Sequence, residues 1–356
     1  MILPIYHEIE NIEMNMYLKQ FSQRIFKLNY LDDFTLKDSF LYCSGFDLNK
    51  NNAYLKALGE AIERYTMNLY EIKENQELIN FNEKFSNNFF SEVNLDYPLH
   101  ALPMKNLKDD SIEYFPNEMI NFKVTNSLEQ YFPISSNGFA AHTNKFLAIN
   151  NALLEVIERH IILKNWATLD TDNFKKINLD NTGINPIILN TIKEIERDGW
   201  IFFAFLIIDS ISIPTVLIWC HNPFKEKYYM GASCNENFNV SLENALLECL
   251  SKFNNNSLID VNKSKDITYI LGKIYKSSEE NTYRSFSTLD EIKEKIDVYY
   301  KDFSLTENKE EYGYVVYKVI VKNLIYYWDK ETCYLRQLKN RNKLFEKYGI
   351  FSLYSY

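Results

Sequence analysis

Glycine is scarce in this chain and lies in no arrangement that cradles a phosphate. Nine glycines occur among 356 residues, and the closest two, Gly45 and Gly59, are fourteen residues apart. The GxGxxG and GxxxxGK[ST] loops need glycines within a few residues of one another, so neither loop is present. If the chain binds a phosphate-bearing ligand, side chains and bound metal ions must contact the phosphates.

Cysteine and histidine are also few, and neither shows a metal-binding spacing. The five cysteines include no CxxC pair, and their odd number does not indicate a disulfide framework. The five histidines form no HxH or HxxxH pair, which argues against a zinc site. This cysteine usage predicts a reducing compartment.

A basic segment and a long apolar run are missing as well. The formal net charge is −9 and the isoelectric point is near 5.3, and no Lys/Arg stripe stands out that could neutralise nucleic-acid phosphates. The longest apolar run, residues 200–208, is far too short to span a bilayer, and the N-terminal residues lack the basic flank of a signal peptide. We therefore expect a cytoplasmic chain that binds neither nucleic acid nor a membrane.

What the chain does contain is a repeated acidic motif. Residues 57–64 read ALGEAIER and residues 152–159 read ALLEVIER, with six of eight letters shared at a separation of 95. A weaker copy, ALLECL, occupies residues 245–250, a further 93 residues along. Periods this long exceed those of stacked solenoid repeats, so the pattern indicates a duplicated, pseudo-symmetric fold.

The apolar patterning predicts a mixed α and β chain. No Pro/Ser-rich linker interrupts it, so one continuous domain is expected. The predicted strands are residues 40–46, 200–209, 213–220, 228–233 and 314–321, with 200–220 as a hairpin, and the predicted helices are residues 52–71, 145–166, 242–253 and 334–348. The predicted loops are residues 72–96, 105–112, 254–266 and 304–311.

The first copy of the motif places three charged side chains on one face of its helix. Glu60, Glu63 and Arg64 stand at positions i, i+3 and i+4, which meet on one side of an α-helix. An exposed pair of Glu60 and Arg64 would look the same and would be worth only about 0.3–0.5 kcal/mol. This helix alone therefore favours an ordinary solvated face.

The second copy points to buried acids. Glu155, Glu158 and Arg159 lie in a helix that is apolar on nearly all sides, with Ile162 and Trp166 flanking the charged face. Buried ionised carboxylates must be paired or must bind a cation. Oxygen ligands without clustered His or Cys favour magnesium, and arginines beside them suit a bidentate phosphate. The pattern predicts a metal–nucleotide site, and a purely structural ion-pair network is the alternative.

Two Glu-x-x-Glu-Arg helices in this order, the second preceded by an SNG-x-A segment, form a specific pattern. On these residues the chain resembles the YcaO family of ATP-dependent enzymes that modify peptide backbones. The matching stretches are residues 44–70, 136–161, 231–253 and 315–324. The resemblance implies an α+β YcaO-like catalytic domain at residues 40–325, with mixed sheets and helices around a central ATP and magnesium cleft, an N-terminal segment at 1–39 and a helical tail at 326–356.

The resemblance also implies ATP and Mg2+ as cofactors and assigns residues to both. In such proteins the paired glutamates hold magnesium ions on the ATP phosphates, and the arginines lie near the phosphates or brace the acids. The implied magnesium ligands are Glu60, Glu63, Glu155 and Glu158. The implied ATP-binding residues are Lys56, Arg64, Asn137, Arg159, Glu248 and Lys252.

The activity implied is ATP-dependent cyclodehydration of Cys, Ser or Thr in a ribosomally synthesised precursor peptide, which forms azolines. The expected partner is a separate ubiquitin-activating-enzyme-like protein that binds the peptide's leader, because the chain has little room for a fused recognition domain. Thioamide or amidine formation uses the same ATP chemistry and stays open, since the chain ends FSLYSY without the proline-rich tail of many azoline-forming members. A homodimer also stays open.

Several positions depart from the family pattern. Phe46 stands where a lysine is usual, and Thr143 stands where an asparagine is frequent. Ser251 and Phe253 occupy positions where a glutamine and an arginine usually follow the third helix's glutamate. Lys56 replaces a frequent serine and is a candidate to restore a cationic contact. These departures leave a second hypothesis, a nucleotide- or peptide-binding assembly subunit without turnover.

Overall fold

The chain groups into two compact units. The computed structural model describes residues 7–9, 14–32, 37–69, 77–80, 98–121, 136–168, 171–225, 227–255, 272, 274–276, 286–322 and 324. The first unit comprises residues 1–12, 22–156 and 293–334, and the second comprises residues 13–21, 157–292 and 335–356. Helix α4 (Lys145–Thr168) passes from the first unit into the second, and each unit has sheets of its own.

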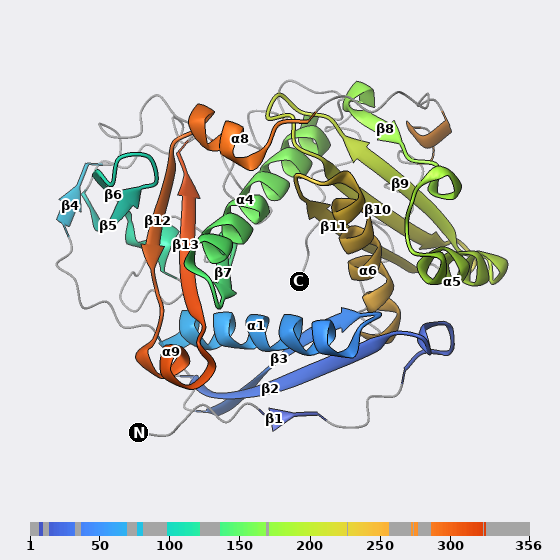
Figure 1. Ribbon diagram of the computed structural model, residues 1–356, viewed down its shortest axis with the longest axis horizontal. Helices are drawn as coiled ribbons and strands as arrows, with labels where there is room; N and C mark the ends of the chain where they lie inside the picture. The colour runs from blue at the N-terminus through green and yellow to red at the C-terminus, as the bar shows by residue number, and fades with distance from the viewer. Residues whose placement is uncertain are drawn as a thin grey trace. The chain divides into compact units, whose positions relative to one another are not determined.

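A three-stranded antiparallel sheet and one long helix open the first unit (Figure 1). Its strands are, in spatial order, β1 (His7–Glu8), β2 (Ser22–Asp32) and β3 (Lys37–Asp47), and the helix α1 (Lys50–Leu69) packs on β3 and β2. Small fully buried residues of α1 let the helix lie close to the strands. They are Ala53, Ala57 and Ala61.

A larger antiparallel sheet forms the rest of the first unit. Its strands are, in spatial order, β4 (Glu77–Ile79), β5 (Leu99–Asn106), β12 (Val298–Asp302), β13 (Val315–Val321) and β7 (Phe139–His142), and β6 (Ile112–Pro116) pairs with β5. The short helices are α3 (Asn117–Ile120) and α9 (Thr306–Tyr312). The antiparallel pairing of β13 with β7 places Lys318 opposite Phe139. After β7 the chain continues into α4.

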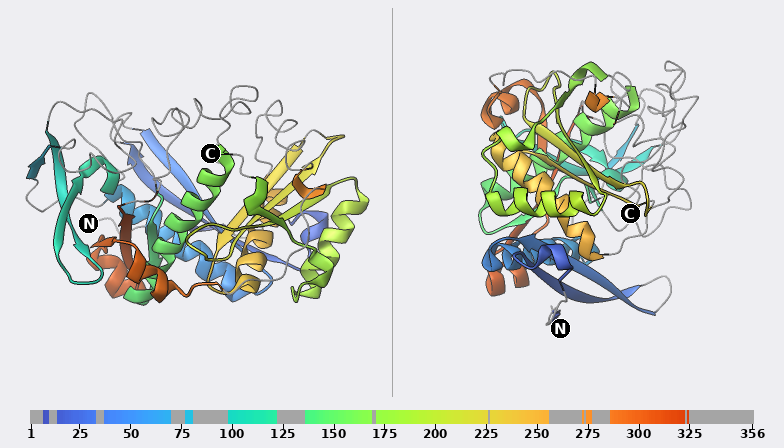
Figure 2. Two further views of the ribbon diagram at one scale, coloured as in Figure 1. Left: turned by 90° about the horizontal axis from the view of Figure 1, so that it is seen from above. Right: turned by 90° about the vertical axis from the view of Figure 1, so that its right-hand side faces the viewer.

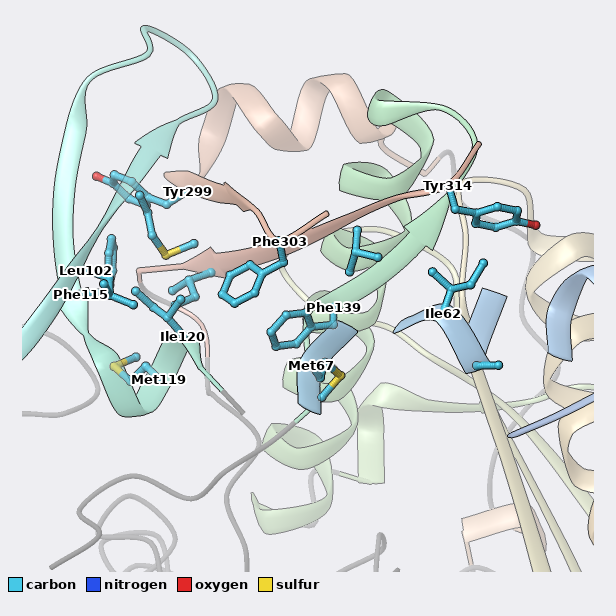
Figure 3. Packing of buried hydrophobic residues seen from close by; sticks show 14 of the residues in the cluster. Ile62, Met67, Leu102, Phe115, Met119, Ile120, Phe139, Tyr299, Phe303 and Tyr314 are labelled. Carbon is cyan, nitrogen blue, oxygen red and sulfur yellow. The ribbon is translucent and has the colours of Figure 1, made fainter. Parts of the chain in front are cut away.

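The core of the first unit is a cluster of apolar and aromatic side chains from α1 and from both sheets (Figure 3). Phe139 and Phe303 meet edge to face, with their ring centroids 5.1 Å apart. Ile62 and Met67 of α1 are fully buried in the same cluster. Because aromatic rings bury large apolar areas, this cluster fixes α1 firmly to the strands that precede α4.

A four-stranded antiparallel sheet is the centre of the second unit. Its strands are, in spatial order, β11 (Lys227–Cys234), β10 (Thr215–Asn222), β9 (Ile201–Ile207) and β8 (Phe174–Lys176). Helix α6 (Phe238–Asn255), gold in Figure 2, packs on β11 and β10, and α5 (Pro186–Arg197) contacts β9. Helix α8 (Leu289–Lys295) begins in this unit, which also contains the short 3-10 helices Met16–Leu18, Thr171–Asn173 and Leu179–Asn181.

The predicted α+β class is confirmed, with corrections to individual elements. β9 and β10 pair in register, which confirms the predicted hairpin at residues 200–220. The predicted loop at residues 304–311 is wrong, because α9 occupies most of it; its polar sequence shows no apolar period. The short strand β4 contradicts part of the predicted loop at residues 72–96. The elements that were not predicted are strands β1, β2, β4, β5, β6, β7, β8 and β12 and helices α3, α5, α8 and α9. The predicted helix at 334–348 lies outside the described residues, and the domain limits at 39 and 325 stay predictions.

The part of the chain that the structure describes contains no helix with the length and apolarity needed to cross a membrane.

Candidate functional site

Among the described residues, helices α1, α4 and α6 begin with the same asparagine cap, which α5 also has through Asn185. The Oδ1 atoms of Asn49, Asn144 and Asn237 accept hydrogen bonds from the backbone N–H two residues further on, at 2.8, 2.8 and 2.9 Å. These bonds satisfy N–H groups that have no partner inside the helix. Helices α1, α4 and α6 are the three that carry the repeated acidic sequence. The repeat is therefore a strand–turn–helix unit, and its turn was missed by the sequence analysis.

A glutamate eleven residues after the cap in each of these three helices ties the helix to the strand that leads into it. In each case the Oε2 atom accepts a hydrogen bond from a backbone N–H at or beside that strand. β3, β7 and β11 each lie at an edge of their sheet among the described strands, so these N–H groups have no ladder partner on that side. The donor and acceptor pairs are Ser44 and Glu60 (2.9 Å), Gly138 and Glu155 (3.3 Å), and Ala232 and Glu248 (2.8 Å).

Glu63 brings the two acidic helices together inside the first unit. Burial raises the pKa of Glu63 well above its usual value, and the charges of Glu155 and Glu60 raise it further, whereas Arg64 and Lys318 lower it. Glu155 belongs to α4 and Glu63 to α1, so carboxylates from both Glu-x-x-Glu-Arg motifs act on each other. When two carboxylates interact in this way, either one of them holds a proton or a cation lies nearby.

Arg64 is the cation of the first motif. Its Nε lies 4.0 Å from Oε1 of Glu60, and its side chain is 27% exposed. Burial lowers the pKa of Arg64, but the charges of Glu63, Glu60 and Glu155 outweigh burial and raise it. Its guanidinium therefore stays charged beside three carboxylates. The predicted solvated face of this helix is only partly correct, because its charged side chains face other charged groups.

Lys318 is a site residue that the sequence analysis did not single out. It lies in β13 with a fully buried side chain, and the charges of Glu155 and Glu63 act on it. Its Nζ donates a hydrogen bond to the backbone oxygen of Asn137 at 2.5 Å. A lysine inside the apolar run at residues 315–321 is the signal that could have found it, since a lysine is almost never buried without a partner.

Glu158 and Arg159 lie in the part of α4 that belongs to the second unit. The two side chains are 13% and 14% exposed, and Nε of Arg159 is 3.7 Å from Oε1 of Glu158. Burial is the main cause that raises the pKa of the Cys234 thiol, and the charge of Glu158 adds to it. Glu158 therefore faces the end of β11. The apolar side chains around it, including Ile162, are buried, which confirms that this helix is buried; the side chain of Trp166 lies outside the description.

The remaining predicted ATP-binding residues have different surroundings. Lys56 is exposed, and its Nζ pairs with Oδ2 of Asp47 at 2.7 Å. Asn137 is 2% exposed and lies in the turn before β7. Glu248 is held by β11 as described above, and Lys252 is half-buried one turn further along α6.

The donor set fits magnesium. Among the described residues, no group of three His, Cys, Asp or Glu side chains is arranged to hold a metal ion by itself. Mg2+ commonly binds one or two carboxylates and completes its octahedron with water and substrate phosphates. Glu63 and Glu155, whose charges act on each other, are the candidates for such a pair. The arrangement therefore suits a magnesium ion that arrives with a nucleotide.

Comparison with protein families identifies one matching model. It is described as YcaO cyclodehydratase, ATP- and Mg2+-binding, and it matches residues 44–319. The matched segment includes helices α1, α4 and α6 and most of β13, with Lys318. A search of curated protein sequences finds no match to this chain.

Solved structures with the same fold share little sequence with the chain. YcaO from Methanopyrus kandleri bound with AMPPCP and Mg2+ is 14% identical with a TM-score of 0.63, over 89% of this chain and 85% of that one. A chain of the E. coli microcin synthetase McbBCD complex is 16% identical with a TM-score of 0.62, and the match covers 91% of this chain and 91% of that one. A heterocyclase in complex with substrate and cofactor is 13% identical with a TM-score of 0.64. The match covers 86% of this chain but only about half (48%) of the heterocyclase.

Proposed function

The chain belongs to the YcaO family, and we propose that it uses ATP to activate a backbone amide in a ribosomally synthesised precursor peptide. The observation that carries this proposal is that equivalent backbone hydrogen bonds hold Glu60 of α1 and Glu155 of α4. The charges of Glu155, Arg64 and Lys318 all act on Glu63. Helices α1 and α4, which are distant in the sequence, thus contribute carboxylates whose charges interact. A nucleotide carried by magnesium needs this combination of charges.

The residues proposed to hold magnesium are the four glutamates of the two complete motifs. They are Glu60, Glu63, Glu155 and Glu158. Glu60 and Glu155 each have one carboxylate oxygen fixed by a backbone N–H, so the other oxygen is pre-positioned for a ligand. When bound, the metal would neutralise phosphate charge and polarise the phosphoryl group.

The residues proposed to contact ATP carry cationic or polar side chains and come from both units. They are Lys56, Arg64, Asn137, Arg159, Glu248 and Lys252. Arg64 and Arg159 would bind phosphate oxygens through their planar guanidinium groups, which suit bidentate contacts. Lys56 would have to exchange its exposed pairing with Asp47 for a phosphate, and an exposed ion pair costs little to break.

The most direct reaction is cyclodehydration. A Cys, Ser or Thr side chain of the peptide adds to the preceding carbonyl carbon, the γ-phosphoryl group of ATP passes to the resulting oxygen, and that oxygen departs as phosphate to leave an azoline and ADP. The attacking thiol or hydroxyl loses its proton when it adds to the carbonyl carbon, and formation of the C=N bond releases the amide proton. The chain's cations would stabilise the charge on the transferring phosphoryl group.

A separate leader-binding protein is proposed as the partner of this chain. The McbBCD protein is a complex, and it is also known with pro-MccB17 bound, which supports an assembly of this kind. Thioamide or amidine formation would use the same activated oxygen with a different nucleophile, and it is the alternative within the same chemistry.

Two buried phenylalanines favour a second candidate function, a nucleotide- or peptide-binding assembly subunit without turnover. Phe46 is 7% exposed, and Phe253 is 6% exposed. The Phe253 ring packs against the rings of Trp200 and Tyr229, with centroids 4.7 Å away from each. At these two positions, where the family usually has cations, this chain has apolar packing.

The test is phosphate release with ATP, Mg2+, a precursor peptide and a leader-binding protein, both sought among the genes that neighbour the gene of this chain. Peptide-dependent release that disappears in the Glu63→Gln variant supports the enzyme. Mass analysis then separates the product classes, because loss of one water indicates an azoline or an amidine and exchange of oxygen for sulfur indicates a thioamide. Nucleotide binding without phosphate release in the complete mixture would instead support the assembly subunit.

A further inference from the structure

The first unit holds a lysine in a place where a charge is costly. Lys318 lies in the middle of β13, directly opposite Phe139 of β7, and its side chain has no exposed surface. An ammonium group removed from water must be compensated by hydrogen bonds and by opposite charge. The hydrogen-bond acceptors and charges around Lys318 therefore indicate its role.

One compensating group is the backbone before β7. Nζ of Lys318 donates to the carbonyl oxygen of Asn137 at 2.5 Å and lies 4.4 Å from the centroid of the Phe139 ring. A hydrogen bond from a charged donor is stronger than a neutral one, and the ring face adds a cation–π contact. Lys318 thus holds the Asn137 peptide group in place.

The same strand also fixes the residue that follows Asn137. The N–H of Val319 donates to the carbonyl oxygen of Gly138 at 2.7 Å, and the N–H of Gly138 donates to Oε2 of Glu155 at 3.3 Å. Gly138 has φ +78, and a Cβ there would overlap the carbonyl oxygen of Val319. A continuous set of bonds therefore runs from β13 through this turn to the carboxylate of Glu155.

The other compensating groups are acids. Burial lowers the pKa of Lys318 to about 7, and the charges of Glu155 and Glu63 oppose this lowering. Lys318 in turn opposes the rise in the pKa of Glu63. One acid from each of the two Glu-x-x-Glu-Arg helices thus favours the charged form of Lys318.

We propose that Lys318 is a positioning residue of the nucleotide site, where its buried ammonium group holds the Asn137–Gly138 turn and balances Glu63 against Glu155. This inference rests on the proposed function. Because its side chain is buried, Lys318 acts through these groups and does not itself touch ATP. The two carboxylates are then held together before magnesium and nucleotide arrive.

The first experiment measures binding of AMPPCP with Mg2+ to the full chain by calorimetry. We expect Lys318→Met to weaken this binding by about 10- to 100-fold, the usual loss when a group that orients metal ligands is removed. Lys318→Arg keeps the charge and should recover much of the affinity. The matched control is Lys301→Met, a buried lysine paired in register with Lys318 on β12, which should leave the affinity unchanged.

The outcomes separate the two proposals. If the wild-type chain does not bind AMPPCP with Mg2+, the proposed function fails. If the wild type binds and Lys318→Met binds equally well, or if Lys301→Met loses as much, the function stands and the role of Lys318 is overturned.

The second experiment tests the charge balance without nucleotide or metal. Lys318→Met should lower Tm because it leaves two acids with one cation fewer, and adding Glu63→Gln should raise Tm again by removing one of those acids. Contacting residues show such non-additivity, whereas a purely packing role predicts that the two losses add. If Lys318→Met does not fold alone, the double variant is measured, and its failure to fold also overturns the proposal.

Discussion

The backbone N–H of Ser44 in β3 donates to Oε2 of Glu60 in α1 at 2.9 Å. The glutamate therefore has two roles, as an acid of the candidate site and as the partner of an edge-strand N–H. These roles can be separated, because glutamine keeps an oxygen that accepts the same hydrogen bond while it loses the charge. Alanine removes both the charge and the acceptor.

We predict that Glu60→Gln abolishes ATP turnover with little change in stability, whereas Glu60→Ala also destabilises the fold. Leaving a partly buried N–H without its acceptor costs about 1–3 kcal/mol. Urea unfolding and phosphate release on both variants check this. Equal stability of the two variants would show that the Ser44 hydrogen bond contributes nothing.

The equivalent of the Ser44–Glu60 hydrogen bond in the second unit joins Ala232 and Glu248, where Oε2 of Glu248 accepts from the N–H of Ala232 at 2.8 Å. Here too we expect the alanine variant to be less stable than the glutamine variant. Because this helix lacks the second glutamate of the motif, the comparison isolates the structural role of the first one.

The asparagine caps give a prediction on stability. Replacing Asn144 by alanine removes the acceptor for the N–H groups of Phe146 and Leu147 and should cost about 1 kcal/mol, the usual loss for a helix cap. Asn144→Asp keeps an acceptor and should keep most of the stability. Thermal unfolding of both variants decides this, and an alanine variant as stable as the aspartate variant would contradict it.

Two glycines near the first motif should respond to alanine in opposite directions. A Cβ at Gly45 would overlap the carbonyl oxygen of Ala53, so α1 would have to move away from β3, and overpacking of this kind costs about 1–3 kcal/mol. At Gly59 the nearest atoms would lie 3.9 Å from the new Cβ, an ordinary contact. Gly59→Ala should therefore stabilise the helix by about 0.5–1 kcal/mol. Measured Tm values that move in the same direction for both variants would contradict this.

The acidic residues could be predicted from the sequence because they repeat. Glu60, Glu155 and Glu248 stand in similar strings of letters, and the same alignment also contains Asn49, Asn144 and Asn237 at a constant offset. The asparagines were overlooked because a lone Asn is common in an Asn-rich chain, and only the observed hydrogen bonds separate the caps from the rest.

Lys318 could not be placed from the sequence, because its role depends on strand pairing. Its position opposite Phe139 follows from the antiparallel register of β13 and β7, and a shift of one residue would turn its side chain to the other face of the sheet. Likewise, the approach of Glu63 to Glu155 depends on how α1 and the sheet with β7 pack in the first unit, which no local pattern records.

A last prediction concerns acid stability in the second unit. The side chain of Asp209 is 2% exposed, and its Oδ2 pairs with Nζ of Lys164 at 2.9 Å. Burial raises the pKa of Asp209, but the hydrogen bond and charge of Lys164 outweigh burial and hold the pKa below its usual value. The unfolded chain, with an Asp pKa of about 3.9, therefore binds this proton more readily than the folded chain. The stabilisation is present above that pH and is lost as the pH falls through the folded pKa.

The Asp209→Asn variant should accordingly be less stable than the wild type at neutral pH, by an amount that shrinks below about pH 4. Urea unfolding of both proteins between neutral pH and about pH 3 measures this difference. The control is Asp180→Asn, which removes an ion pair between Asp180 (62% exposed) and Lys193 (46% exposed). An exposed pair is worth about 0–1 kcal/mol, so the free energy of unfolding of this variant should stay close to that of the wild type at every pH. A gap for Asp209→Asn that widens as the pH falls would mean that Lys164 does not stabilise the ionised carboxylate in the folded chain.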